Sequence, residues 1–337
     1  MKPIGVVGGG SWGTALAVQF SRSGQEVRLW VRRPEHALEL SRERVNRTYL
    51  PDVELPSSLV PTARLSDLDE CDLILVVVPS HGFRPVVKNL LRQRPAERPV
   101  TLISATKGIE AETGARMSEV CFEEAINTDR EVLFGVLSGP TFAAELAQGL
   151  PAAGVIASED VDLAAQLQTQ LSAKNYRLYS STDVVGVELG GATKNVIAIA
   201  AGAVAGLGLG HNTLAALITR GLHEITRLGL ACGGQARTFS GLAGLGDLVL
   251  TCTGGLSRNR RTGFELARGQ TLEQITAATS MVAEGIRNAR SVSQLAHQKG
   301  VEMPIIEQMV KVLYEGVAPR EAVEPLMTRE LKAEAAL

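Results

Sequence analysis

A glycine-rich segment near the N-terminus, GGGSWG at residues 8–13, has the spacing GxGxxG and follows the apolar run IGVV at residues 4–7. In a strand–loop–helix unit, Gly8 permits a tight turn, Gly10 lets the backbone approach a pyrophosphate, and Gly13 allows close helix packing. The N-terminus of the following helix offers N–H groups and a partial positive charge to an anion. The segment therefore predicts a dinucleotide site, and the alternative is a structural turn.

Two arginines, Arg32 and Arg33, follow the second apolar run at residues 26–31. NAD-specific enzymes usually carry an acidic residue there, which holds the ribose 2′-hydroxyl. Guanidinium groups instead suit a 2′-phosphate, because they form paired, charge-assisted hydrogen bonds. This favours NADP(H) and leaves NAD(H) open, and the alternative is a pair of solvated surface arginines.

Residues 9–13 also satisfy GxSxG, the pattern of a hydrolase nucleophile elbow, with His297 as a conceivable partner. An elbow normally follows several strands, whereas this segment follows the first. The dinucleotide interpretation is therefore preferred.

Lys194 is a single cation in a small, apolar helical segment, residues 188–212. Such a lysine either extends its amine to the surface or lies in a desolvated pocket, where it can exchange a proton near neutral pH. The residues alone leave these two interpretations open.

A second polar group lies within residues 241–263. Asp247 is an isolated carboxylate beside an apolar run, and Ser257, Arg258 and Asn259 offer a hydroxyl, a guanidinium and an amide in succession. These donors suit a phosphate or another small anion. With the two arginines that follow, the segment could instead form a nucleic-acid patch, but it lacks interleaved aromatic residues.

Three further segments, at residues 77–80, 104–110 and 138–143, each come at the end of another apolar run. The carboxyl ends of parallel strands meet at one edge of a sheet, so these loops are expected to share a ligand site. His223-Glu224 lacks the second histidine of HExxH, and no metal site is expected.

The elements that must position these residues change character near residue 183. Before it, short apolar runs at 4–7, 26–31, 73–78, 100–104, 132–137 and 155–157 alternate with helical patterns. This alternation predicts an α/β fold with a doubly wound parallel sheet. After it, the patterns are helical, at 184–205, 213–228, 261–267, 291–299 and 305–314. We therefore expect a dinucleotide-binding domain at residues 1–182 and a mainly α-helical substrate-binding and catalytic domain at 183–337.

Composition narrows the classes of function. The chain has 337 residues, with 34 Lys and Arg against 36 Asp and Glu, so its net charge of −2 argues against a general nucleic-acid binder. The apolar stretch at residues 196–210 is too short to span a bilayer, and no signal-peptide pattern is present. Four cysteines without CxxC spacing favour free thiols in a reducing compartment, so we expect a cytoplasmic protein.

Taken together, these residues resemble the NAD(P)-dependent sn-glycerol-3-phosphate dehydrogenase family, bacterial type. The stretches that carry the resemblance are GGGSWGTALA (8–17), NRTYLP (46–51), VPSHGFR (78–84), SATKGIE (104–110), SGPTFA (138–143), ELGGATKNVIAIAAG (188–202), ALITRGL (216–222), GLAGLGDLVLTCTGGLSRNR (241–260) and MPIIEQMVKVLYEG (303–316). They occur in order along nearly the whole chain, and the KN, GDL and SRN runs are highly specific.

The resemblance implies a role for each matching residue. Lys194 matches the proton donor and acceptor. Substrate contacts are implied for Lys107, Gly139, Thr141, Lys194, Asp247, Ser257, Arg258 and Asn259. Cofactor contacts are implied for Ser11, Trp12, Arg32, Arg33, Lys107, Ala143, Arg258, Val282 and Glu284, beside Gly8, Gly10 and Gly13 of the loop.

The family implies a Rossmann domain followed by a helical domain, a homodimer, a small phosphate substrate, and a role in glycerophospholipid synthesis. Residues 281–290 depart from the family pattern, which leaves cofactor preference and feedback control open. Two other classes also stay open: a two-domain dehydrogenase with a carboxylate substrate, and a non-catalytic protein that senses NADP.

Overall fold

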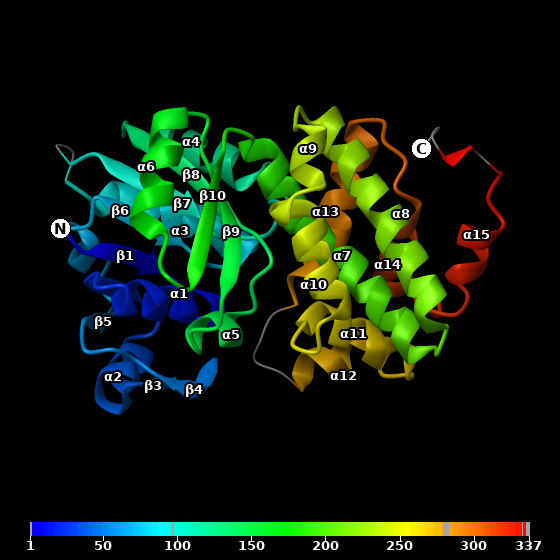
Figure 1. The fold of residues 1–337 in the computed structure, drawn as a ribbon, viewed down its shortest axis with the longest axis horizontal. Helices are drawn as coiled ribbons and strands as arrows, with labels where there is room; N and C mark the ends of the chain where they lie inside the picture. Colours follow the sequence, from blue (N-terminus) through cyan, green and yellow to red (C-terminus); the bar gives the residue numbers. More distant parts are fainter. Residues whose placement is uncertain (1, 96–97, 279–282, 332, 335–337) are drawn as a thin grey trace. The chain divides into compact units, whose positions relative to one another are not determined.

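The computed structural model describes residues 2–95, 98–278, 283–331 and 333–334. Its contacts divide the chain into two compact units (Figure 1). The N-terminal unit contains residues 1–110 and 115–184, and the helical unit contains residues 111–114 and 185–337. The division after Val184 falls two residues beyond the boundary expected from the sequence.

The N-terminal unit is built on an eight-stranded sheet in the order β10-β9-β8-β7-β6-β1-β2-β5 (Figure 1). The strands are β1 (Ile4–Val7), β2 (Val27–Trp30), β5 (Leu59–Thr62), β6 (Leu73–Val76), β7 (Val100–Ser104), β8 (Val132–Ser138), β9 (Ala152–Ala157) and β10 (Tyr176–Ser181). The six strands from β8 to β5 are parallel, and the chain order reverses between β1 and β6. This is the doubly wound Rossmann arrangement, which confirms the predicted fold class of this half.

Two strands at one side of the sheet run against the others. β9 pairs antiparallel with β8, and β10 pairs parallel with β9. The sequence predicted a doubly wound parallel sheet and did not indicate these two reversed strands, because a continuous apolar run carries no information about strand direction. β5 and β10 were not expected either: β5 contains Pro61, and β10 alternates buried and exposed residues instead of forming an apolar run.

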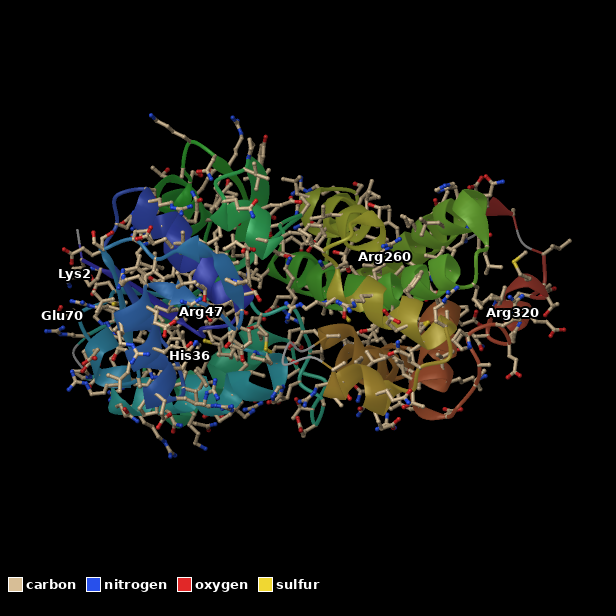
Figure 2. The ribbon with its side chains drawn as sticks, turned by 90° about the horizontal axis from the view of Figure 1, so that it is seen from below. Lys2, His36, Arg47, Glu70, Arg260 and Arg320 are labelled. Atoms are coloured by element: carbon tan, nitrogen blue, oxygen red, sulfur yellow. The ribbon has the colours of Figure 1, made fainter. Side chains whose placement is uncertain are left out.

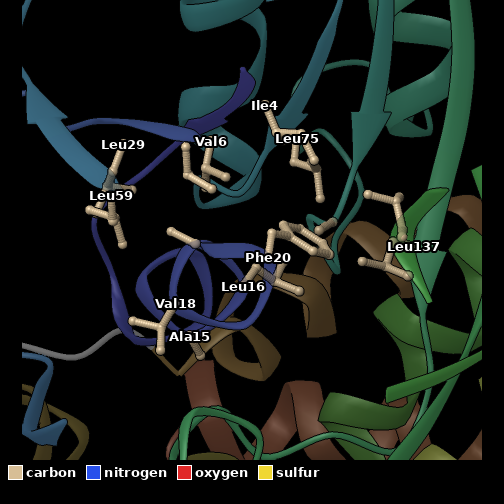
Figure 3. Close-up of a cluster of buried hydrophobic side chains, with 14 of the residues drawn as sticks. Ile4, Val6, Ala15, Leu16, Val18, Phe20, Leu29, Leu59, Leu75 and Leu137 are labelled. Carbon is tan, nitrogen blue, oxygen red and sulfur yellow. The ribbon is translucent and has the colours of Figure 1, made fainter. Parts of the chain in front are cut away.

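Helices flank this sheet. They are α1 (Ser11–Arg22), α2 (Pro34–Glu43), α3 (Ser80–Gln93), α4 (Met117–Asn127), α5 (Ala143–Ala147) and α6 (Val161–Leu171), and a separate ribbon pairs β3 (Val45–Asn46) with β4 (Leu50–Glu54). Figure 3 shows Leu16 and Phe20 of α1 packed beneath strand residues that include Val6. Burying one such side chain contributes about 1.5–3 kcal/mol. This burial fixes α1, whose first turn contains the end of the glycine segment, against the sheet.

The helical unit contains no strand among its described residues, as the sequence predicted. Its elements are α7 (Val184–Gly206), α8 (Gly210–Ala231), α9 (Ala236–Phe239), the π-helical turn η2 (Leu242–Gly246), α10 (Asp247–Thr253), α11 (Arg258–Ala267), α12 (Leu272–Ala277), α13 (Glu284–Gln298), α14 (Pro304–Tyr314) and α15 (Val323–Met327). The helices α8, α11 and α13 begin earlier than the apolar periodicity indicated, because their first turns carry polar side chains, and α14 begins one residue earlier, at Pro304.

Helix α7 forms the core of the helical unit. It is long and apolar enough to cross a membrane, but 89% of its most apolar 18-residue window is buried within the protein. Its glycines allow neighbouring backbones to approach closely. A Cβ atom on Gly202 would lie 1.8 Å from the Arg260 carbonyl oxygen, and one on Gly263 of α11 would lie 1.8 Å from that of Ile199. These contacts fix α11, and the polar residues at its start, against α7.

Candidate active site

The parallel strands bring the predicted N-terminal site residues to one edge of the sheet. The glycine loop follows β1, Arg32 and Arg33 follow β2, and residues 77–80 follow β6. Lys107 lies beyond the end of β7, and Gly139 lies directly beyond β8. All five segments therefore lie at the carboxyl ends of strands, on the side where this fold binds ligands.

The glycine loop has the geometry that a pyrophosphate requires. Gly8 has φ +125°, and a Cβ there would lie 2.3 Å from the Val77 carbonyl oxygen. A Cβ on Gly13 would lie 1.9 Å from the Gly8 carbonyl oxygen, whereas a Cβ on Gly10 would have no atom within 4 Å. The close contacts hold the loop in its turn, and the open space at Gly10 leaves room for a ligand.

The start of α1 is also suited to an anion. No side chain caps this helix, and its first turn carries no acidic residue. The Trp12 indole nitrogen is buried and has no hydrogen-bond partner among the described residues. A buried N–H normally has a partner, and an acceptor atom of a bound ligand could fill this role. The residues present therefore fit the pyrophosphate end of a dinucleotide.

Arg32 and Arg33 are exposed beyond the end of β2, and Arg33 directly precedes α2. Neither guanidinium forms an ion pair within the described part of the chain. The position beyond the second strand is the one that meets the adenosine ribose in this fold. The geometry thus leaves both side chains available for a 2′-phosphate.

Lys107, Gly139 and Thr141 lie together. Lys107 is half-buried and donates a hydrogen bond from Nζ to the Gly139 carbonyl oxygen at 3.1 Å, and the Thr141 hydroxyl donates to the same oxygen at 3.2 Å. Gly139 has φ +131°, and a Cβ there would lie 2.8 Å from the Gly154 Cα. Ala143 begins α5 two residues beyond Thr141. The ammonium and the hydroxyl are therefore held side by side at the sheet edge.

In the helical unit, Lys194 of α7 is buried rather than extended to the surface, with 5% of the residue exposed. Its Nζ donates to Asp247 Oδ1 at 2.5 Å and to Thr251 Oγ1 at 2.7 Å. Asp247 is 1% exposed, so both charges of the pair are removed from water. This burial shows that Lys194 does not extend its amine to the surface, and its role as a proton donor and acceptor stays a prediction.

Thr251 also belongs to this cluster, although the sequence did not predict it. It lies one turn after Asp247 on α10 and donates its hydroxyl proton to the Asp247 carbonyl oxygen at 2.6 Å. That bond commits the only proton of the hydroxyl, so its oxygen accepts from Lys194. The signal available in the sequence was the spacing of four residues, which places Asp247 and Thr251 on one helix face.

The π-helical turn η2 immediately precedes Asp247. A Cβ on Gly190 of α7 would lie 2.7 Å from the Ala243 carbonyl oxygen, so this turn packs closely on α7. π-Helical turns are rare and often lie at functional sites. Here the turn brings Asp247 to the helix that carries Lys194.

A second network joins α7, α11 and α13. Asn259 donates from Nδ2 to Asn195 Oδ1 at 2.9 Å, and its own Oδ1 accepts from the Gly285 N–H at 2.9 Å. Ser257 caps α11 by accepting from the Arg260 N–H, and Arg258 is exposed in the first turn (Figure 2 marks Arg260 on α11). These bonds fix the start of α11, where three anion donors were predicted.

The remaining predicted cofactor contacts lie at the start of α13. Glu284 is its first residue and is half-buried, with a favourable electrostatic interaction with Arg258. Val282 lies outside the described residues. The structure therefore places Glu284 near Arg258, as a shared site would require.

A thiol near this cluster is not a nucleophile. Cys252 follows Thr251 and is fully buried, and burial raises its pKa to about 12. The reactive form of cysteine is the thiolate, so Cys252 stays protonated and inert at neutral pH.

This chain resembles known proteins along nearly its whole length. The family described as "NAD-dependent glycerol-3-phosphate dehydrogenase N-terminus" matches residues 3–164, and its C-terminal counterpart matches residues 183–324. A glycerol-3-phosphate dehydrogenase [NAD(P)+] from Citrifermentans bemidjiense is 49% identical over 99% of both chains. One from Geobacter sulfurreducens is 50% identical over 98% of both. The crystal structure of glycerol-3-phosphate dehydrogenase from Coxiella burnetii has a TM-score of 0.92 and 40% identity, covering 97% of this chain and 99% of that one.

Proposed function

Because the chain belongs to the NAD-dependent glycerol-3-phosphate dehydrogenase family, we infer that it reduces dihydroxyacetone phosphate to sn-glycerol 3-phosphate, reversibly, with NADP(H) or NAD(H). The observation that carries this proposal is the buried Lys194–Asp247 pair, held at 2.5 Å in a chain whose first strand ends in a dinucleotide loop. A carbonyl reduction needs a hydride and a proton. The glycine loop suits the dinucleotide that carries the hydride, and Lys194 is the source of the proton.

The cofactor, when bound, supplies a hydride from nicotinamide C4 to the substrate carbonyl carbon. Negative charge then develops on the carbonyl oxygen, and protonated Lys194 donates its Nζ proton to that oxygen. Asp247 and Thr251 hold Nζ in position through the two hydrogen bonds at 2.5 and 2.7 Å. In the reverse direction, neutral Lys194 accepts the hydroxyl proton. General acid–base catalysis of this kind contributes about 10²–10⁴-fold to the rate.

The other predicted residues bind and orient the substrate and the cofactor. Ser257, Arg258 and Asn259 bind the substrate phosphate, while Lys107, Gly139, Thr141 and Asp247 orient its oxygenated carbons. The Asn259 amide nitrogen has a second N–H beside the one that it donates to Asn195, and that N–H serves the phosphate.

For the cofactor, the bare start of α1, Trp12 and the two exposed arginines support binding of the pyrophosphate and the 2′-phosphate. The remaining cofactor contacts that we propose come from Ser11, Ala143, Arg258, Val282 and Glu284. Arg32 and Arg33 favour NADP(H) over NAD(H).

We further propose a cytoplasmic homodimer that supplies glycerol phosphate for glycerophospholipid synthesis. The four free cysteines, three of them buried, support a reducing compartment. Sedimentation of the purified chain tests the dimer, since a monomeric mass would contradict it.

The reaction is tested by following reduced-nicotinamide absorbance with dihydroxyacetone phosphate and either NADPH or NADH. We expect oxidation that depends on the substrate and is faster with NADPH. A carboxylate substrate in its place should support no oxidation. Folded protein that binds dinucleotide but oxidises neither cofactor would contradict the activity and favour a sensor of NADP instead.

A further inference from the structure

The stretch NRTYLP at residues 46–51 belongs to the resemblance, yet no role has been assigned to it. Its first residue, Asn46, ends the short strand β3 and is 1% exposed. The Asn46 amide nitrogen donates to the Gly9 carbonyl oxygen at 2.9 Å and to Thr14 Oγ1 at 2.8 Å. One buried side chain thus holds the middle of the glycine loop and the first turn of α1.

His36 fixes the orientation of this amide. The Gly9 carbonyl can only accept a hydrogen bond, so Asn46 Nδ2 must face Gly9 and Asn46 Oδ1 must face His36. The His36 Nε2 atom lies 3.3 Å from that oxygen and therefore donates to it. His36 is 7% exposed, lies on α2 two residues after its first residue, and also packs beside Gly9 (Figure 2 marks His36).

Holding the Gly9 carbonyl has a consequence for ligand binding. The Gly9 carbonyl and the Gly10 N–H belong to one planar peptide group and point in opposite directions. Anchoring the carbonyl therefore fixes the direction of the Gly10 N–H, one of the backbone donors in this loop. Glycine residues are otherwise free to sample many backbone conformations, which would lower the fraction of molecules ready to bind.

We propose that Asn46, oriented by His36, is a positioning residue that presets the phosphate loop for the dinucleotide pyrophosphate. This proposal rests on the proposed function and adds to it the device that keeps the loop ready to bind. Asn46 acts through the backbone of residues 9–10 and touches no reacting atom. Its effect should be equal for NADPH and NADH, because both carry the same pyrophosphate.

The test measures the Kd of NADPH and of NADH directly, by quenching of tryptophan fluorescence, together with Tm, kcat and KM. We expect Asn46→Ala to raise both Kd values about tenfold. This rise corresponds to a fall to about one tenth in the fraction of molecules whose loop is ready to bind. The cofactor KM should rise in parallel, while kcat at saturating cofactor stays near that of the wild type.

Asn175→Ala is the matched control. Asn175 exchanges two side-chain hydrogen bonds, at 2.9 and 3.0 Å, with Gln19 at the other end of α1. Its loss should lower Tm as the loss of Asn46 does, but leave both Kd values unchanged. Equal weakening of binding in Asn175→Ala would overturn the proposal, because a general loss of stability would then explain the result.

A pair of His36 variants tests the coupling and keeps the proposal testable if Asn46→Ala does not fold. His36→Gln retains an N–H donor near the position of Nε2 and should bind like the wild type. His36→Leu should raise both Kd values about threefold, and should add nothing in the Asn46→Ala background. Additive effects of the two substitutions would contradict the coupling.

The possible failures are distinguishable. Wild-type protein that bound neither dinucleotide would overturn the proposed function, and this inference with it. Wild-type binding that persists unchanged in both Asn46→Ala and His36→Leu would overturn this inference alone.

Discussion

In the N-terminal unit, the groups assigned to the cofactor lie in loops at strand ends or in the first turn of the helix that follows, and all but Gly13 are exposed or half-buried, whereas Lys194, Asp247 and Thr251 lie within helices and are buried. The difference follows from the two tasks. Binding an anion needs backbone N–H groups that a ligand can reach, while transferring a proton needs a charged group shielded from water and held rigidly. Substitutions in the first region should therefore change affinity, and those in the second should change turnover.

The largest expected effect separates these two regions. Asp247→Ala removes the carboxylate that lies 2.5 Å from Lys194 Nζ and leaves that ammonium buried without its counter-charge. We expect kcat to fall by about 10²–10⁴-fold, and the Kd of NADPH to stay unchanged. Stopped-flow kinetics measure kcat, and fluorescence titration measures the Kd of NADPH. A weakened Kd with normal kcat would reverse the comparison.

A charge cluster in the N-terminal unit, two of whose carboxylates are buried, should affect stability rather than turnover. Arg84 of α3 forms paired bonds to Glu110 at 2.6 and 2.7 Å, and also bonds Glu123 and Glu124. The Glu110 and Glu124 side chains are only 8% and 3% exposed. Arg84→Ala would remove the Arg84 guanidinium from both buried carboxylates, so we expect a loss of about 3–5 kcal/mol in unfolding free energy.

The control for that prediction lies in the same unit. Arg64 pairs with Asp67 on the surface, with 79% of the Arg64 side chain exposed. Arg64→Ala should cost at most about 1 kcal/mol in urea unfolding. Equal losses for the two variants would show that burial does not decide the energetics of these pairs.

Glu224 gives the helical unit a pH dependence of its own. Its carboxylate accepts from the N–H groups of Ile305 and Ile306 at the start of α14, but burial raises its pKa to about 7. The two N–H groups and Arg227 act to lower this pKa, and Glu307 acts to raise it. The unfolded pKa is near 4.5, so between pH 4.5 and 7 the folded state binds more protons. The contribution of Glu224 to stability is therefore complete below pH 4.5 and falls as the pH rises through 7.

Glu224→Gln should remove this slope. The amide oxygen can still accept from Ile305, and the residue no longer has to ionise in a buried place. We expect the unfolding free energy of the wild type to fall by about 2 kcal/mol more than that of the variant between pH 5 and 8, measured by urea unfolding. The exposed Glu315→Gln is the control and should keep the wild-type slope. Parallel pH profiles for Glu224→Gln and the wild type would contradict the prediction.

The smallest effect concerns Gly10. A methyl group there meets no protein atom within 4 Å, so Gly10→Ala should fold with a near-normal Tm. It should still weaken NADPH about tenfold, or ~1.4 kcal/mol, because the added Cβ occupies the space left for the pyrophosphate. Gly82→Ala on α3, which also meets no atom within 4 Å, should leave binding unchanged. Normal binding by Gly10→Ala would show that the pyrophosphate does not approach this residue.

The sequence predicts the N-terminal unit better than the helical one, for a physical reason. A strand, a GxGxxG loop and a helix follow one another directly in the sequence. The spacing of Gly8, Gly10 and Gly13 therefore predicts the local structure on both sides of the loop. The reversed direction of β9 was missed, because apolar runs of either direction look alike. The bonds of Asn46 also join residues more than 30 positions apart, and periodicity does not report such contacts.

In the helical unit, the sequence located the helices but left Lys194 undecided between surface and pocket. What decides it is Asp247, which is 53 residues away and is brought to α7 by a π-helical turn that no pattern indicated. Resemblance, rather than periodicity, assigned these two residues a shared role. The contacts between them come from packing of whole helices at glycines such as Gly190 and Gly202.

The most direct test of the account is Lys194→Met, studied together with Lys194→Met/Asp247→Asn, which leaves no buried charge unpaired. For both variants we would measure NADPH affinity and the oxidation of NADPH that depends on dihydroxyacetone phosphate. We expect unchanged NADPH Kd values and a kcat lowered by about 10²–10⁴-fold in both. Turnover near that of the wild type in either folded variant would contradict the assignment of Lys194 as the proton donor.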